Sequence, residues 1–122
     1  MEDIIDNVCK ILDVPSIDPD EQGIVFDDDV LIYIERDSDT VGLFSPFCAL
    51  PENINDIIYA LSLNYSDKVY LTTDNEGGSL IARLDLSTIY EYEDISAHVE
   101  YFVMRVRWLK EIFARRMLGG GI

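Results

Sequence analysis

The sequence predicts an α+β fold in which an antiparallel sheet packs with three helices, in the order helix, three strands, helix, two strands, helix. Two stretches, 30–44 and 68–86, join apolar or β-branched runs through short polar turns, as β-hairpins do. Three others, 2–12, 52–65 and 94–117, repeat apolar residues at helical spacing.

Length and charge limit the kind of protein this is. The 122 residues suffice for one domain, which we expect to span 1–118, with 119–122 as a flexible tail. The formal net charge of −15 argues against nucleic acid and anionic membrane surfaces as partners and favours a basic partner. The N-terminus, MEDIID, carries acids where a signal peptide needs bases, so we expect a cytoplasmic protein.

The first helix, 2–12, has a wide apolar face. At about 100° per residue, its apolar side chains cover an arc of about 160°, which is wide for a helix with a single contact. These side chains are Ile4, Ile5, Val8, Cys9, Ile11 and Leu12. We expect the helix to end at Val14, because the residue before a proline avoids the α region.

The central hairpin follows a short strand, Gly23–Phe26. Val30–Glu35 is apolar on both faces, so we expect this strand to be covered on both sides. Val41–Phe44 returns as its partner. Pro46 and Pro51 are then expected to stop the ladder, because proline has no N–H to donate.

The second helix, 52–65, has Asn53 as its expected N-cap and carries apolar residues on two sides. One side is the stripe Ile54, Ile57, Ile58, Leu61 and Tyr65, and the other carries Tyr59 and Leu63. Such a helix is either buried between layers or faces a second subunit. The sequence does not choose which face would form a dimer.

The third helix, 94–117, has a clear core stripe of Ile95, Val99, Phe102, Val106, Leu109 and Phe113. Its far side is expected to carry Tyr101, Met104, Trp108 and Ile112. The turn at 74–78 joins the two strands of the second hairpin. It is rich in residues that tolerate positive φ, and it lacks the residues of a phosphate-binding loop.

Known catalytic and metal-binding patterns are missing from the sequence. His98 is the single histidine, and no local motif pairs it with a serine or cysteine nucleophile. Cys9 and Cys48 are 39 residues apart and are interpreted as reduced core thiols. We therefore expect no catalytic residue, no metal and no cofactor, and interpret the chain as a non-enzyme. The plentiful carboxylates leave a small hydrolase with a carboxylate pair as an alternative.

Five segments, taken in order, carry a family resemblance. They are LDVPSIDPDEQG, FDDDVLIYIERDSDTVGLFSPFCALP, ALSLNYS, DNEGGSLIARLDL and FVMRVRWLKEIF. In this order and spacing, over about residues 3–114, the chain resembles the class I chaperones of bacterial type III secretion. Asp13 and Asp29 stand where that family usually has glycine, and aspartate tolerates such turn positions.

The resemblance implies a homodimeric escort in the bacterial cytoplasm. Class I chaperones bind the N-terminal chaperone-binding segment of a secreted effector, keep it extended and present it to the secretion ATPase. The PFCALP and LNY segments look most like the subgroup that serves inositol-phosphate-phosphatase effectors. A regulatory anti-activator on the same fold, which titrates a transcription factor, is the alternative within the family.

Two sets of residues are candidates for binding. We expect the effector segment to contact an apolar strip that runs from the first helix to the exit of the central hairpin, because such a strip on an acidic protein needs a cover. The strip is Ile5, Cys9, Leu12, Tyr33, Phe44 and Phe47. The dimer interface is expected on the second helix, at Ile54, Ile57, Ile58, Tyr59, Leu61 and Leu63.

Overall fold

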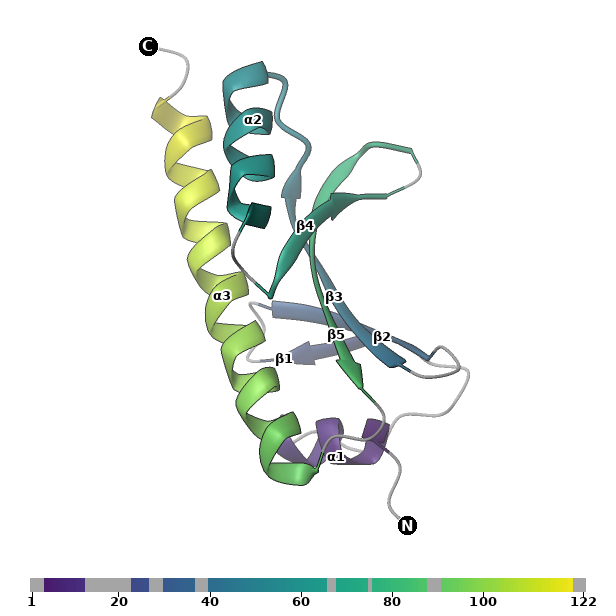
Figure 1. Ribbon diagram of the computed structural model, residues 1–122. Coiled ribbons are helices and arrows are strands. Elements are labelled where there is room, and N and C mark those ends of the chain that lie inside the picture. The colour runs from purple at the N-terminus through teal and green to yellow at the C-terminus, as the bar shows by residue number, and fades with distance from the viewer. Residues whose placement is uncertain are drawn as a thin grey trace.

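The computed structural model describes residues 4–12, 23–26, 30–36, 40–65, 68–74, 76–87 and 91–119. The elements follow the predicted order (Figure 1). They are α1 (Ile4–Ile11), β1 (Gly23–Phe26), β2 (Val30–Arg36), β3 (Thr40–Ala49), α2 (Ile54–Ser62), the 3₁₀ turn η1 (Leu63–Tyr65), β4 (Tyr70–Thr73), β5 (Ser79–Ser87) and α3 (Tyr92–Gly119). The expected end of the first helix at Val14 lies outside the described residues. Of the expected tail at 119–122, Gly119 is the last residue of α3, and residues 120–122 lie outside the described residues.

The described strands form one five-stranded antiparallel sheet in the order β1-β2-β3-β5-β4. The long strands β3 and β5 pair in its middle, and β1 and β4 lie at its edges. Sheet and helices therefore meet as two layers, with α3 running the length of one sheet face (Figure 1).

The expected stop of the third strand at Pro46 is wrong, because β3 continues to Ala49. The register with β2 runs only as far as Phe44, opposite Tyr33, among the described residues. The pairing of β3 with β5 covers the whole strand, from Thr40 opposite Ser87 to Ala49 opposite Ser79, and its register shifts between Pro46 and Cys48. Proline is tolerated where one side of a strand needs no donor and at such irregularities.

The long helix α3 supplies the largest share of the core. All six residues of its predicted stripe are buried, with Phe102 and Phe113 among the largest fully buried side chains. The expected far side is only partly correct. Met104 is exposed, whereas Tyr101, Trp108 and Ile112 are half-buried and pack against the core. The rest of the chain therefore covers more of the surface of α3 than its sequence indicates.

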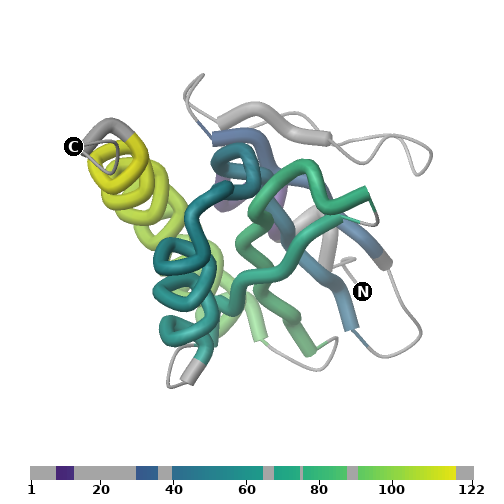
Figure 2. Tube along the Cα trace, turned by 90° about the horizontal axis from the view of Figure 1, so that it is seen from above, coloured from purple at the N-terminus to yellow at the C-terminus, as the bar shows by residue number. Residues whose placement is uncertain are grey.

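Helix α2 lies beside the C-terminal half of α3 (Figure 2). The side chain of Asn53 caps it by accepting a hydrogen bond from the backbone N–H of Asn55 at 2.9 Å, as predicted. Tyr59 faces inward, with its ring 5.8 Å from the ring of Phe113 and 4.0 Å from the guanidinium of Arg116. Arg116 also donates to the buried carboxylate of Asp56 at 2.9 Å.

The outer edge of the sheet at β4 is partly occupied. The side-chain amide of Asn64, in η1, donates to the carbonyl of Leu71 at 3.1 Å and accepts from its N–H at 2.7 Å. The side chain thus satisfies both polar groups of one edge-strand residue, which limits pairing with another chain there. The neighbouring β4–β5 turn uses Gly77 at φ 68°, a conformation that glycine adopts without steric cost.

Candidate sheet-face binding site

The two faces of the sheet differ in burial. Along β2, Val30, Ile32 and Ile34 are buried beneath the helices, whereas Leu31 and Tyr33 are half-buried on the opposite face. The expectation that this strand is covered on both sides is therefore only half met. We call the face turned away from α3 the open face. Because side chains alternate along a strand, each strand contributes every second residue to it.

An aromatic pair lies near the centre of the open face. Tyr33 of β2 and Phe44 of β3 are directly opposite in the register, and their rings stack with centroids 5.3 Å apart and planes 14° from parallel. Both side chains are half-buried. A stacked aromatic pair on a partly exposed sheet face offers apolar area to a partner without having to rearrange.

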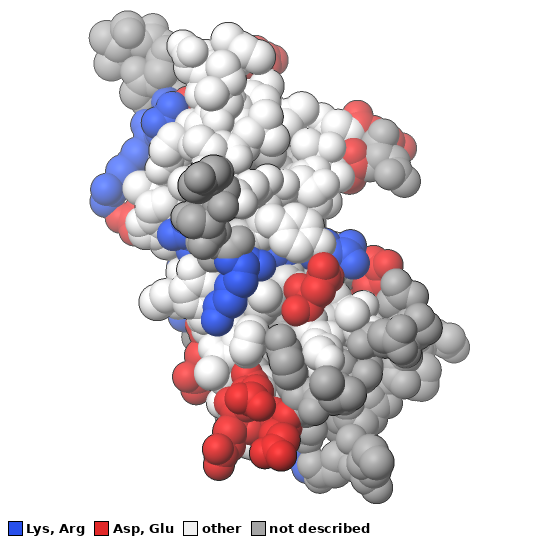
Figure 3. All heavy atoms as spheres, in the orientation of Figure 1, with Lys and Arg blue, Asp and Glu red and all other residues white. Residues whose placement is uncertain are grey.

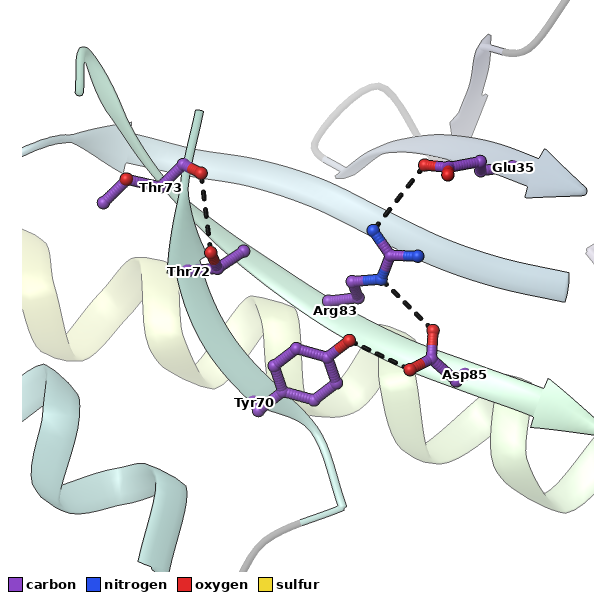
Figure 4. A network of polar contacts seen from close by, with 6 residues as sticks. All are labelled: Glu35, Tyr70, Thr72, Thr73, Arg83 and Asp85. Carbon is purple, nitrogen blue, oxygen red and sulfur yellow. Dashed lines mark hydrogen bonds and ion pairs between the residues drawn. The ribbon is translucent and has the colours of Figure 1, made fainter. Parts of the chain in front are cut away.

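A polar network borders this pair, because Arg83 is opposite Phe44 in the register. Figure 4 shows the network. Arg83 of β5 donates from Nε to Asp85 at 3.1 Å and faces the carboxylate of Glu35 on β2 at 3.6 Å. The hydroxyl of Tyr70 on β4 donates to the other oxygen of Asp85 at 2.9 Å. The network therefore links side chains from three strands across the open face.

The environment of the network is visible in two pKa shifts. Burial and the hydrogen bond to Asp85 raise the pKa of the Tyr70 phenol, so it remains a donor at neutral pH. Burial alone would lower the pKa of Arg83, but the hydrogen bond to Asp85 and the nearby carboxylates outweigh it and raise that pKa. Both groups are therefore held in their protonated, hydrogen-bonding forms.

The predicted effector strip is divided between two places. Tyr33 and Phe44 meet on the open face. Cys9, Leu12 and Phe47 are instead buried in the core, so the single exposed strip expected from the sequence is not formed. The side chain of Ile5 falls outside the described part of the structure.

The reason for the division is geometric. Helix α1 packs against α3, and the described apolar residues of its arc turn inward: Val8, Cys9 and Leu12 are buried in the core, and Ile11 packs against it. Phe47 lies three residues after Phe44, which reverses the face in a strand with a period of two, and its ring packs 5.5 Å from that of Phe113. The odd spacing was visible in the sequence. The network was also signalled there, because Ile81, Arg83 and Asp85 alternate on one face of β5.

A hollow of about 340 Å³ lies where α1 meets α3. It is mostly apolar, and its lining includes Ile11, Leu12, Val103, Met104 and Arg107. Leu12 thus borders a space at the surface although its own side chain is buried.

The predicted dimer residues on α2 are also divided. Ile54, Ile58 and Leu61 are 63%, 57% and 62% exposed and form an apolar ridge on the outer side of α2. Ile57 is half-buried beside them, whereas Tyr59 and Leu63 pack against the core. Figure 3 shows a largely uncharged surface over α2, with basic side chains along the outer edge of α3 and acidic ones gathered at its lower end. The structure thus selects the side of α2 that a partner could reach.

Other candidate groups have local explanations. Nδ1 of His98 lies 2.7 Å from the carbonyl of Asp94, one turn earlier in α3. Burial raises the pKa of the half-buried Cys48 thiol to about 11, so this thiol is poorly reactive at neutral pH.

In the part of the chain that the structure describes, no three His, Cys, Asp or Glu side chains gather as metal ligands. None of the described helices combines the length and the apolar character that crossing a membrane needs.

Taken together, the fold and its surfaces define a small α+β domain that offers an open aromatic sheet face and an apolar helical ridge. The chain belongs to the type III secretion chaperone family, because residues 3–114 match the model of the type III secretion chaperone domain. It is 63% identical to the chaperone protein IpgE of Shigella sonnei, over 98% of this chain and 99% of that protein. It is 30% identical to the chaperone protein SigE of Salmonella typhimurium, over 84% and 88% of the two chains.

Solved structures share the fold at low sequence identity. A chain of the HopA1-SchA chaperone–effector complex superposes with a TM-score of 0.69 at 13% identity, covering 88% of this chain and 91% of that chain. A chain of the ExsC-ExsE complex gives 0.68 at 14% identity, covering 88% and 89%. The predicted order of elements and the family resemblance are thereby confirmed.

Proposed function

We propose that the chain is a cytoplasmic escort that holds the N-terminal segment of a type III secreted effector against its open face. The observation that carries this proposal is the stacked pair of Tyr33 and Phe44, half-buried on a sheet face that no described helix covers. An extended segment can place alternate side chains on such a surface. Membership of the chaperone family and the likeness to a chain of a chaperone–effector complex support the same function.

The core residues of the predicted strip take a supporting role in this proposal. Cys9 and Phe47 hold the sheet and helices in place from behind the open face, and Leu12 does so beside the hollow. The escort requires no catalytic residue, metal or cofactor. It delivers the effector to the secretion ATPase, and the effector is an inositol-phosphate phosphatase.

The working form is a homodimer that joins through the ridge of Ile54, Ile58 and Leu61. Burying large apolar side chains that are more than half exposed stabilises association, and removing them from water accounts for their presence on an acidic protein. Ile57 lies at the border of this interface, and Tyr59 and Leu63 position α2 from within. Light scattering at micromolar concentration should give twice the chain mass of 13.9 kDa, and an Ile58→Asp variant should give the single-chain mass. A wild-type mass near 13.9 kDa would contradict the dimer.

Capture is tested by co-expression with the product of the neighbouring gene, followed by pull-down. Burying one aromatic anchor contributes on the order of 2 kcal/mol, so Phe44→Asp should weaken binding more than about tenfold. Trp108→Ala, on α3, is the matched control and should bind normally. Both variants are first checked for wild-type helical circular dichroism. Normal capture by Phe44→Asp together with loss by Trp108→Ala would place the site on the other side of the molecule.

A further inference from the structure

The open face carries an ordered row of side chains across four strands. The register places Tyr33 opposite Phe44, Phe44 opposite Arg83, and Arg83 opposite Tyr70. Three aromatic residues and one arginine therefore occupy one line of the register across β2, β3, β5 and β4. We call this the aromatic row.

A second row lies next to it, two residues along each strand. Glu35 is opposite Gly42, and Gly42 is opposite Asp85. The absence of a side chain at Gly42 gives Arg83 room to cross β3, because a Cβ there would come within 2.9 Å of its Nη2. The guanidinium can therefore lie between the carboxylates of Glu35 and Asp85 (Figure 4).

The charges around the second row, which holds the carboxylates of Glu35 and Asp85, are not balanced. Arg83 is one cation facing two carboxylates. Asp85 uses both of its oxygens, one with Arg83 and one with the hydroxyl of Tyr70. Glu35 stands 3.6 Å from Arg83, longer than a hydrogen bond, and its side chain is 51% exposed. The surplus negative charge thus resides at an accessible carboxylate beside the aromatic pair.

We propose that Glu35, Arg83 and Asp85 select a lysine or arginine in the captured segment, two residues away from an apolar side chain. The proposal rests on the proposed capture of an extended segment by the open face. The two rows are roughly 7 Å apart along a strand, which equals the spacing of residues i and i+2 in an extended peptide. An apolar side chain over Tyr33 and Phe44 therefore brings the next side chain on the same face over Glu35.

Charge complementarity decides the sign of that side chain. A basic group is attracted by the accessible carboxylate of Glu35 and by the net charge of −15 on the chain. An acidic group meets a guanidinium that already faces two carboxylates, so it gains little from Arg83 and is repelled by Glu35. The captured motif is thus apolar-x-basic or basic-x-apolar.

The inference is tested with a phage-displayed library of random peptides of about 15 residues, selected on the full-length protein. On the wild type, the motif should be enriched. On Glu35→Gln/Asp85→Asn the enrichment of basic residues should disappear, and on Glu35→Lys it should change to acidic residues. A merely structural role of the network would not reverse the preference. Glu76→Gln, an exposed acid in the β4–β5 turn, is the matched control and should keep the wild-type preference.

The outcomes separate this inference from the proposed function. If apolar peptides without basic residues are enriched, and Phe44→Asp abolishes their binding, the open face captures peptides but the charge selection is wrong. If the basic preference persists in the double variant, the selection comes from other residues and the inference is overturned. If no peptide is enriched on any variant, the inference fails. The pull-down with Phe44→Asp then decides the proposed function separately.

Discussion

The ion pair of Asp56 with Arg116 joins α2 to the C-terminal end of α3. Its coupling energy can be compared with that of the exposed ion pair formed by the neighbouring arginine, Arg115. Asp56 is 11% exposed and Arg116 is 35% exposed in their side chains, with 2.9 Å between Oδ1 and Nε. The exposed pair, Glu111 with Arg115, is 58% and 71% exposed on the surface of α3. Both pairs involve an arginine of the same helix, but the Asp56 pair joins two helices and is more buried, whereas the Glu111 pair lies within α3 and is exposed.

The expected coupling energies follow from that difference. Exposed ion pairs contribute about 0.3–0.5 kcal/mol, whereas breaking a fully buried pair costs about 3–5 kcal/mol. Because more than a third of Arg116 is in water, its pair with Asp56 should be discounted to a coupling of about 1–1.5 kcal/mol. The contact of Arg116 with the ring of Tyr59 adds to the effect of Arg116→Ala but cancels in the coupling.

The assay is a double-mutant cycle by urea unfolding, using Asp56→Ala, Arg116→Ala and their combination. With an m-value of about 2 kcal/mol/M, the coupling corresponds to a shift of about 0.6 M in the midpoint. All variants are measured at one protein concentration, since dimer dissociation would make stability depend on concentration. In about 1 M salt the coupling energy of the exposed pair, Glu111 with Arg115, should vanish, whereas most of the coupling energy of Asp56 with Arg116 should remain. A coupling for Asp56 with Arg116 no larger than that of the surface pair would refute the reasoning.

Three further predictions follow from single sites. Phe113→Ala should cost about 3–5 kcal/mol in unfolding free energy, since its buried ring contacts two other aromatic rings, and a loss below about 1 kcal/mol would contradict this. Asn64→Ala should cost about 1–2 kcal/mol and raise light scattering on storage, because Leu71 loses its two side-chain hydrogen bonds at the sheet edge; unchanged stability and solubility would argue against this role. In a Cys9→Ser variant, Cys48 should react with a disulfide reagent at pH 8 about tenfold more slowly in the folded than in the unfolded protein, because its raised pKa lowers the thiolate fraction. The folded state should also lose stability above about pH 9, where only the unfolded thiol ionises readily; equal reaction rates would show that Cys48 is not shielded.

Periodicity predicted the elements of this fold because each has a strong local cause. The stripe of α3, the cap at Asn53 and the turn ending at Gly78 are all set by neighbours within a few residues, and all are found in the structure. Pro46 misled the prediction because its tolerance depends on where the pairing with β2 ends, which is a tertiary property.

The candidate site was predicted less well, for reasons that lie outside any local window. The orientation of α2 is decided by Phe113 and Arg116, which lie more than 50 residues further along the chain than Tyr59. The pairing of Tyr33 with Phe44 and the reach of Arg83 to Glu35 depend on strand register, which hydrophobic pattern alone does not specify. The division of Phe44 and Phe47 between faces, by contrast, could have been predicted from their odd spacing.

Photo-crosslinking from the open face tests the central claim most directly. A benzophenone amino acid is placed at Leu31, on the open face two residues from Tyr33, or at Ala97, exposed on α3, and the variants are co-expressed with the product of the neighbouring gene. The account predicts a crosslink to the N-terminal segment of that product from position 31 and none from position 97. A crosslink from position 97 alone would contradict it.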